Sequence, residues 1–230
     1  MELLFATNNR HKVDEIRSVT GKSLEIMTLQ EAGIDIDIPE PFDSLEENAT
    51  VKSKTIFELT GISCFSEDTG LEVAALNGEP GVKSARYAGE GRDFQANIDL
   101  LLENLTDKTD RTAQFRTVVS LLWNDQEYLF EGICQGQIIS IQKGQGGFGY
   151  DPVFIPDGAD KTFAEMTIEE KRAFLVAQNK TNVFRALRIT AAYSGQVQVA
   201  DQLLSRLPGG LLVDTNEPLP RFYWGAGKWL

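Results

Sequence analysis

The chain has 230 residues, of which 42% are hydrophobic, and it carries a formal net charge of −12 at pH 7. This length fits one large domain or two small ones, with enough apolar content for a core. The acidic balance argues against a protein that binds nucleic-acid polymers, because that binding depends on Lys and Arg side chains that neutralise phosphates. A single nucleotide is not excluded as a ligand, since a few local cations and Mg²⁺ can hold a triphosphate.

No segment predicts export or a membrane partner. Residues 1–6 lack a basic start and a long apolar stretch, and no apolar run approaches the length of a membrane span. Cys64 and Cys134 lie inside apolar runs, and we expect both to be free, buried thiols. These features predict a cytoplasmic protein.

The first half of the chain alternates strand and helix patterns, as α/β proteins do. A strand, a helix and a second strand are predicted, in this order, at residues 2–6, 12–19 and 24–28. Ser44 and Glu47 form a capping box, so a helix is expected from there to about Leu59, where Gly61 ends it. The apolar run at residues 62–66 is expected to be a strand.

The second half continues with a helix, several strands and a glycine-rich loop. Apolar residues at helical spacing predict a helix at 94–105. Strands are predicted at 114–123, 127–133 and 137–141, and the first two are expected to form a hairpin. The glycine-rich loop covers 144–152, and a helix is expected to open at Thr162 and to reach about Ala173.

The pattern changes from about residue 194, where the periodicity is lost and the chain becomes aromatic without a repeat. We therefore expect one catalytic domain over residues 1–193 and an atypical, poorly ordered C-terminal tail over residues 194–230.

Two adjacent carboxylates, Glu67 and Asp68, follow the predicted strand at 62–66. A carboxylate at the end of a strand is rigidly held, and its oxygens suit a hard cation such as Mg²⁺. Like charges side by side repel each other, and a divalent cation relieves that repulsion. A solvated pair of carboxylates is the alternative interpretation.

The turn after the first predicted strand has the features of a phosphate site, because backbone N–H groups at the start of a helix face outward. Thr7 and Asn9 add side-chain donors and Lys12 adds a point charge. The predicted substrate-binding residues in this turn are Thr7, Asn8, Asn9, Arg10, His11 and Lys12. A capped helix with a solvated face is the alternative. His11 is the single histidine, which argues against histidine-based zinc sites and Ser-His-Asp hydrolysis.

The glycine-rich loop is the candidate site for a base. Its glycines permit a tight backbone, Phe148 offers a ring on which a purine can stack, and Asp151 can accept hydrogen bonds from a base or a sugar. The predicted substrate-binding residues here are Phe148, Gly149, Tyr150 and Asp151. A turn that places an aromatic ring in the core is the alternative.

Together these segments resemble the inosine triphosphate pyrophosphatase family. The resemblance rests on the sequences at 7–15, 47–52, 67–89, 147–152 and 162–171, and it covers roughly Glu2 to Lys171. It implies an elongated mixed β-sheet flanked by helices, with two lobes and a central cleft. It also implies a homodimeric, Mg²⁺-dependent hydrolase that cleaves ITP, dITP and XTP to the monophosphate and pyrophosphate.

The resemblance also implies roles for individual residues. Asp68 corresponds to the acid that serves as catalytic base and metal ligand, and Thr69 to a residue that touches the substrate. Glu40 corresponds to a second metal ligand, although Pro41 and Phe42 replace the usual Thr-Gly after it. Lys171 corresponds to a lysine that contacts the nucleotide.

The resemblance stops after Lys171. Relatives continue with Ser-His-Arg, whose His and Arg contact the 6-keto oxygen of the purine, whereas this chain has Leu175-Val176-Ala177 at the equivalent spacing. Real divergence and a frame change in the coding DNA are both open as explanations. Two functional alternatives follow: a nucleotide-binding protein without catalysis, or a pyrophosphatase of relaxed specificity that accepts ATP and GTP.

Overall fold

The computed structural model describes residues 2–20, 25–123, 125–171, 211–213, 222–224 and 228–229. The chain divides into two compact units, Met1–Gln178 and Asn179–Leu230. The predicted boundary between a domain at 1–193 and a tail at 194–230 stays a prediction. Residues 175–177, where the family pattern ends, lie outside the described residues.

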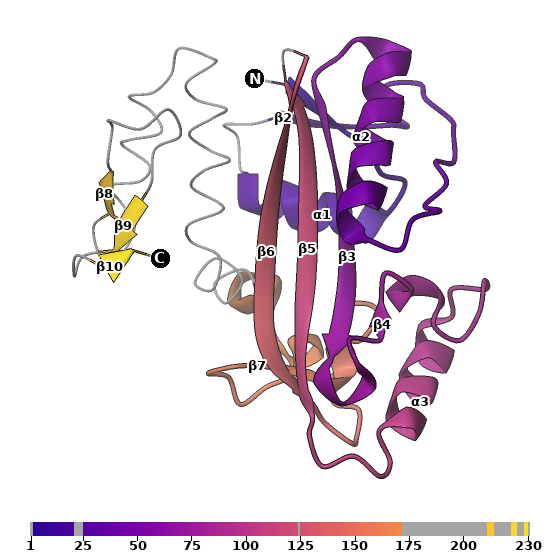
Figure 1. Ribbon diagram of the computed structural model, residues 1–230, viewed down its shortest axis with the longest axis vertical. Coiled ribbons are helices and arrows are strands. Elements are labelled where there is room, and N and C mark those ends of the chain that lie inside the picture. Colours follow the sequence, from indigo (N-terminus) through magenta and orange to yellow (C-terminus); the bar gives the residue numbers. More distant parts are fainter. Residues whose placement is uncertain are drawn as a thin grey trace. The chain divides into compact units, whose positions relative to one another are not determined.

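The first unit is built on a seven-stranded mixed sheet with the order β2-β1-β3-β5-β6-β7, and β4 pairs with β3. Its strands are β1 (Glu2–Phe5), β2 (Glu25–Thr28), β3 (Cys64–Val73), β4 (Pro80–Gly81), β5 (Thr112–Trp123), β6 (Gln126–Ile138) and β7 (Phe154–Pro156). The pairs β1–β2 and β1–β3 are parallel, and the remaining pairs are antiparallel. Figure 1 shows β3, β5 and β6 as long strands side by side.

The helices of this unit are α1 (Arg10–Thr20), α2 (Leu45–Thr60) and α3 (Phe94–Asn104), with short 3₁₀-helices η1 (Ala74–Leu76), η2 (Ser84–Arg86), η3 (Asp151–Val153) and η4 (Phe163–Glu165). The predicted cap of α2 is present, because the Ser44 side chain accepts from the Glu47 N–H. Gly61 ends the helix at φ 66°, a left-handed conformation that glycine adopts without strain.

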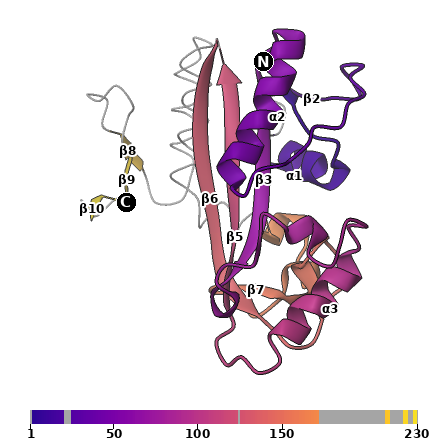
Figure 2. The same cartoon turned by 45° about the vertical axis from the view of Figure 1, so that its right-hand side comes forward.

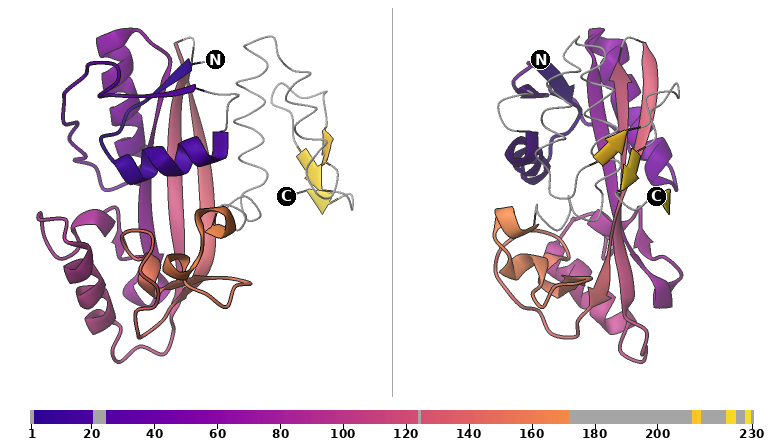
Figure 3. Two further views of the ribbon diagram at one scale, coloured as in Figure 1. Left: turned by 180° about the vertical axis from the view of Figure 1, so that it is seen from behind. Right: turned by 90° about the vertical axis from the view of Figure 1, so that its left-hand side faces the viewer.

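Alternate residues of the central strands face α1 on one side and α2 on the other. Phe5 and Phe65 stack in parallel at 4.3 Å in an apolar cluster with Val13 of α1. Their neighbours Leu4 and Cys64 pack instead with Ile56 of α2. The two helices therefore cover opposite faces of the sheet, which the front and back views show (Figures 1 and 3).

The opposite end of the long strands has a core of its own. Leu71 and Val73 of β3 pack there with Leu101 of α3, Phe154 of β7 and Tyr150 of the glycine-rich loop. Figure 2 shows α3 and β7 grouped at this end, away from α1 and α2. The expected mixed sheet flanked by helices and divided into two lobes is confirmed.

The second unit contains a three-stranded antiparallel sheet of β8 (Leu211–Val213), β9 (Phe222–Trp224) and β10 (Lys228–Trp229), in the order β10-β9-β8.

Three predictions of local structure were wrong. The strand expected at 62–66 is β3, which begins at Cys64 and continues through both carboxylates to Val73, because each of its residues pairs with β5. The strands expected at 127–133 and 137–141 are one strand, β6. The helix expected from Thr162 is only the 3₁₀-helix η4, since Met166 is extended, and helical residues resume at 168–171.

Candidate active site

The candidate site lies where one edge of β3 has no neighbouring strand. On that edge β1 pairs with β3 only at Cys64 and Phe65, and β4 pairs only at Leu71 and Glu72. Among the described residues no strand pairs with this edge between the two contacts, while the other edge is paired with β5 throughout. Residues 66–70 are thus held firmly from one side and open on the other.

The pleat of β3 sends the two adjacent carboxylates to opposite faces of the sheet. Glu67 follows Phe65 on the α1 face, where it forms an ion pair with Lys12 of α1. Asp68 lies on the α2 face, where its Oδ1 atom is 3.6 Å from Nζ of Lys52 in α2. The expected repulsion between neighbouring carboxylates is therefore reduced by geometry and by a separate lysine for each.

A third carboxylate joins them, because Oε1 of Glu40 lies 2.5 Å from Nζ of Lys52. We call these five residues the buried charge cluster: Lys12, Glu40, Lys52, Glu67 and Asp68. With every side chain ionised, the cluster carries one more negative than positive charge. The members on the two faces of the sheet also interact electrostatically, because the charges of Glu40 and Asp68 act on Lys12.

The pKa of Asp68 is raised to about 6, mainly by burial and also by the charges of Glu40 and Glu67, against the lowering effect of Lys52 and Lys12. For Glu67 burial also favours the neutral form, but Lys12 and Lys52 outweigh it and lower the pKa. The pKa of Glu40 is lowered too, because Lys52 outweighs its burial. Asp68 is thus the one carboxyl of the cluster with a raised pKa, and general bases are tuned in this way.

Thr69, predicted to touch the substrate, lies beside Glu67 on the α1 face. Its hydroxyl donates to Oε2 of Glu67 at 2.7 Å and shares a hydrogen bond with the hydroxyl of Thr117 in β5 at 2.8 Å. Its backbone N–H donates to Oδ1 of Asp68 at 3.1 Å. No partner of Oδ2 of Asp68 occurs among the described residues.

The turn before α1 is organised by its own side chains. The Asn9 carboxamide oxygen accepts from the N–H groups of His11 and Lys12, and the Thr7 hydroxyl accepts from the Asn9 N–H. The Asn8 amide donates to the carbonyl of Ile36 at 2.9 Å. Of the six residues predicted here, Lys12 is in the buried charge cluster and Arg10 is exposed. The side-chain oxygens of Thr7 and Asn9 accept bonds that order the turn.

The glycine-rich loop is fixed by Asp151, which is only 3% exposed. Its carboxylate accepts from the Phe148 N–H at 3.1 Å and pairs with Nζ of Lys171 at 2.9 Å. Gly147 has φ 74°, and a Cβ there would lie 2.1 Å from Oδ2 of Asp151. Gly149 is also left-handed, at φ 57°, which leaves Phe148 between two glycine turns.

Two of the predicted nucleotide residues differ in their surroundings. Tyr150 is buried in the core of its lobe, and its hydroxyl donates to the carbonyl of Ser84 at 2.9 Å. Phe148 lies outside the apolar core clusters, and the Lys171 ammonium lies 5.2 Å from its ring centroid. His11 of α1 stacks on the same ring, so the predicted phosphate turn and base loop are in contact.

The sequence interpretation gave no role to Lys52, although it links Glu40 to Asp68. A signal was present in the pattern of α2, whose buried stripe contains Leu45, Ala49 and Ile56 at helical spacing. Lys52 falls on this stripe and is 8% exposed. A lysine on the apolar stripe of a helix is rare unless it is paired, and so indicates a buried partner.

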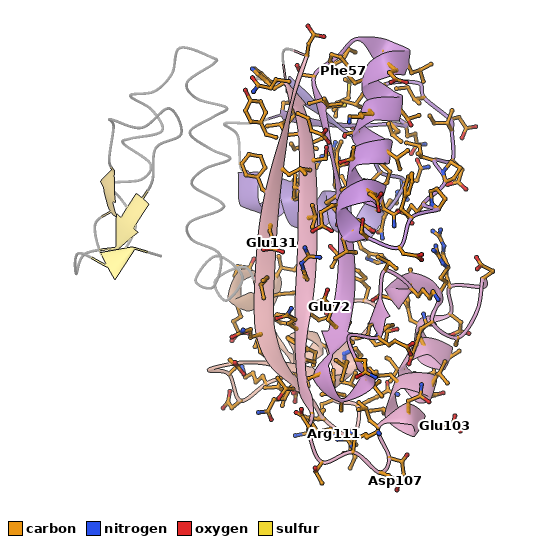
Figure 4. The ribbon with its side chains drawn as sticks, in the orientation of Figure 1. Phe57, Glu72, Glu103, Asp107, Arg111 and Glu131 are labelled. Atoms are coloured by element: carbon orange, nitrogen blue, oxygen red, sulfur yellow. The ribbon has the colours of Figure 1, made fainter. Side chains whose placement is uncertain are left out.

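A second group of charged side chains lies on the same long strands. Figure 4 labels Glu72 of β3 and Glu131 of β6, which both contact Arg116 of β5. Arg116 also pairs with Glu46 in the first turn of α2. We call these four residues the arginine cluster: Glu46, Glu72, Arg116 and Glu131.

The fold and site define an α/β protein whose mixed sheet carries a buried carboxylate–lysine site at an open strand edge. The model of the Ham1 family matches residues 3–183. The chain belongs to this family, which confirms the resemblance found in its motifs.

Curated relatives in this family are dITP/XTP pyrophosphatases. The protein from Flavobacterium psychrophilum is 48% identical over 171 residues, which cover 74% of this chain and 90% of that relative. The protein from Porphyromonas gingivalis is 49% identical over 183 residues, covering 77% and 94%.

Solved structures agree. The Staphylococcus aureus Ham1 protein matches with a TM-score of 0.72 and 35% identity, over 84% of this chain and all of that one. A Ham1 protein from Coxiella burnetii matches with a TM-score of 0.70 and 30% identity, over 88% and 98%. None of the helices in the described part of the chain combines the length and apolar character needed to cross a bilayer.

Proposed function

We propose that this chain hydrolyses unusual purine nucleoside triphosphates, namely ITP, dITP and XTP, to the monophosphate and pyrophosphate. The observation that carries the proposal is the buried charge cluster at the open edge of β3, close to an aromatic base site. Relatives named dITP/XTP pyrophosphatase, at 48% and 49% identity, support the same reaction.

We propose Mg²⁺ as the cofactor, held by Asp68 and Glu40. The described residues contain no group of three or more His, Cys, Asp or Glu that could hold a metal ion alone. Two carboxylates nevertheless suit Mg²⁺, which keeps several waters and takes other ligands from substrate phosphates. The negative excess of the buried charge cluster also favours a cation. When bound, Mg²⁺ would polarise the phosphate oxygens and neutralise their charge.

The reaction adds water across one phosphoanhydride bond. The oxygen of water forms a bond to the α-phosphorus, the bond from that phosphorus to the bridging oxygen breaks, and pyrophosphate leaves. We assign Oδ2 of Asp68 as the acceptor of the water's proton, since Oδ1 already accepts from the Thr69 N–H. The raised pKa of Asp68 makes its carboxylate a better proton acceptor than an ordinary aspartate.

The lysines of the buried charge cluster can exchange partners when substrate binds. Lys12 pairs with Glu67, and Lys52 with Glu40, in the free protein. A triphosphate carries more negative charge than a carboxylate, and an ammonium group is a compact ligand for phosphate. We therefore assign both lysines to the triphosphate, where they offset charge that develops on the leaving group.

The nucleoside would lie against the glycine-rich loop. Phe148 provides the stacking surface, and base–aromatic stacking contributes ~1–3 kcal/mol per base. Asp151 and Lys171 hold the loop in place through their ion pair. Their contacts with the substrate stay a prediction.

A panel of ITP, dITP, XTP, ATP and GTP, scored for pyrophosphate with Mg²⁺ and with EDTA, tests the proposal. Release from the first three with Mg²⁺ alone is the expected result. Nucleotide binding without release would support the alternative of a binding protein that has lost catalysis. Equal release from ATP and GTP would support relaxed specificity, which the absence of Ser-His-Arg at residues 175–177 suggests.

We also propose that the protein is a cytoplasmic homodimer. Cys64 and Cys134 are free and buried, as expected in a reducing compartment. The dimer rests on the family resemblance. Light scattering after gel filtration of the full chain measures the mass in solution, and a monomer at micromolar concentration would contradict it.

A further inference from the structure

The ring of His11 lies against the proposed base site. Its imidazole is stacked on Phe148 with 5.3 Å between ring centroids and 16° between planes. His11 is exposed and Phe148 half-buried, and neither belongs to an apolar core cluster. The contact joins segments 137 residues apart in the chain and lies outside these apolar clusters.

One of the two rings is held and the other is free to turn. Phe148 sits in a loop closed by its N–H bond to Asp151 and by the return bond from the Asp151 N–H to the Phe148 carbonyl, at 3.2 Å. His11 is held by its backbone, which donates to Asn9. The ring nitrogens of His11 make no hydrogen bond within the described residues. A rotation about its side-chain bonds would thus uncover Phe148 at little cost.

The spacing of the rings indicates what could enter. A flat base between two rings needs contacts of about 3.5 Å on each side, and hence about 7 Å between the ring planes. With their centroids 5.3 Å apart the rings leave no room for a base, so the imidazole would have to swing outward, which the side chain of an exposed residue allows.

We propose that His11 is the second wall of the base site, so that the purine of the substrate binds between His11 and Phe148. This inference rests on the proposed function, because it takes a purine nucleotide as the ligand. In the free protein the imidazole covers the face of Phe148. In the complex it rests on the outer face of the base.

His11 and its neighbour Lys12 are placed to contact opposite ends of the nucleotide. Lys12, the next residue of α1, belongs to the buried charge cluster. Consecutive helix residues point in different directions, so one turn can contact the base with His11 and the phosphates with Lys12. A stacked ring does not distinguish the 6-substituent of a purine. His11 should therefore change the affinity for ITP, GTP and ATP by the same factor.

The test compares His11→Ala and His11→Phe, with Asp14→Ala as the matched control on the exposed side of the same helix. Binding of inosine monophosphate is measured by calorimetry in EDTA, and KM and kcat for ITP are measured with Mg²⁺. His11→Ala should weaken monophosphate binding and raise KM by roughly tenfold, with kcat retained. His11→Phe should restore both values, and inhibition by pyrophosphate should be the same in all three variants.

Monophosphate binding unchanged in His11→Ala would overturn the proposal. So would a His11→Phe variant as weak as His11→Ala, because His11 would then act through its nitrogens. Loss of pyrophosphate inhibition in His11→Ala would assign the residue to the phosphates and would also overturn it. If the unmodified protein releases no pyrophosphate from any triphosphate, the proposed function fails, and the calorimetric comparison still decides the role of His11.

Discussion

The buried charge cluster and the arginine cluster both lie along the long central strands, but they are built differently. In the first, three carboxylates share two lysines, and the side chains of Glu67 and Asp68 are 7% and 11% exposed, while that of Glu40 is 27% exposed. In the second, Arg116 pairs with three glutamates whose side chains are 28–47% exposed. Solvent can balance the charges of these glutamates, whereas it reaches Glu67 and Asp68 much less.

The two clusters also use different cations, lysines in the buried charge cluster and an arginine in the other. A guanidinium presents several donors in a fixed plane, which suits a permanent link between β5, β6 and the start of α2. An ammonium is a point charge on a flexible stem and can change partners. A buried cluster with excess charge and exchangeable cations is suited to binding a ligand, and an exposed arginine network is suited to holding strands. We therefore expect the buried charge cluster to bind a ligand and the arginine cluster to hold the strands.

The largest expected effect separates activity from stability at one residue. Asp68→Asn should reduce kcat at least ~10²-fold, because the proton acceptor is lost. The same change should stabilise the metal-free protein by ~1–3 kcal/mol at pH 7.5, because it removes a buried carboxylate that is costly to ionise. Pyrophosphate release and urea unfolding in EDTA measure the two effects. An active Asp68→Asn variant would refute the assignment.

Removal of Lys52 should damage both properties. Lys52→Met leaves Glu40 and Asp68 without their shared cation, and breaking a buried ion pair from one side costs ~3–5 kcal/mol. Thermal unfolding in EDTA should show the loss, and kcat should fall at the same time. A double variant, Lys52→Met with Asp68→Asn, should recover part of the stability but none of the activity. An unchanged melting temperature in the single variant would contradict the coupling.

The metal-free protein should become more stable as the pH falls from about 7 to about 5. The folded-state pKa of Asp68 is raised to about 6, so ionisation opposes folding above that pH, and this cost falls as the carboxyl of the folded protein is protonated. Down to pH 5 the gain is about 1.4 kcal/mol, and the full ~3 kcal/mol of a shift of about two pKa units is reached only below the unfolded pKa of about 4. Glu40 and Glu67 have lowered pKa values, so the stability that they contribute is lost only in more acidic solution.

The variant Asp68→Asn isolates this effect, because the difference in unfolding free energy between it and the unmodified protein should shrink as the pH falls through about 6. A difference that is constant from pH 7 to pH 5 would show that Asp68 ionises normally.

A matched pair of glycines tests the base loop. Gly147→Ala would place a Cβ against Oδ2 of Asp151, at a left-handed position, and should disrupt the loop that holds Phe148. We expect KM for ITP to rise roughly tenfold, as for the loss of a stacked base. Gly158→Ala is the control, since Gly158 is also left-handed, at φ 86°, but has open space and is not a predicted site residue, and it should cost only ~1–2 kcal/mol of backbone strain. Equal kinetic effects would show that strain, and not the contact with Asp151, matters.

The smallest effect is expected in the arginine cluster. Arg116→Gln should lower the unfolding free energy by about 1 kcal/mol or less, because exposed ion pairs contribute little. It should leave kcat and KM for ITP unchanged, and 0.5 M NaCl should erase part of the stability difference. A strong loss of turnover would remove the distinction between the two clusters.

Where the chain obeyed simple periodicity, the sequence predicted the fold well. The cap at Ser44 and the stop at Gly61 bound α2 within a residue of the prediction, because both depend on local backbone chemistry. Strand β3 was predicted too short, because Glu67, Asp68 and Gly70 are poor strand formers alone. Pairing with β5 and the close approach of Gly70 to Gly81 keep them in the strand, and those partners are distant in sequence.

The candidate site was predictable in part. Short motifs pointed to Asp68, Lys12 and Phe148, whose roles in binding and catalysis stay predictions. The partnership of Lys52 with Glu40 could not be read from spacing, since it depends on how the loop before α2 returns to the helix. The stacking of His11 on Phe148 needed the two lobes to meet, which no local pattern specifies.

The pairing of β3 with β5 determines which changes in chain length the site can tolerate. Because neighbouring strand residues face opposite sides, the position of Asp68 opposite Val118 decides which helix its carboxylate meets. Loss of a single codon between Cys64 and Ser66 would keep both carboxylates, yet would move each of them to the opposite face of the sheet. A change of length in this segment would therefore alter the site more than a substitution that keeps the length.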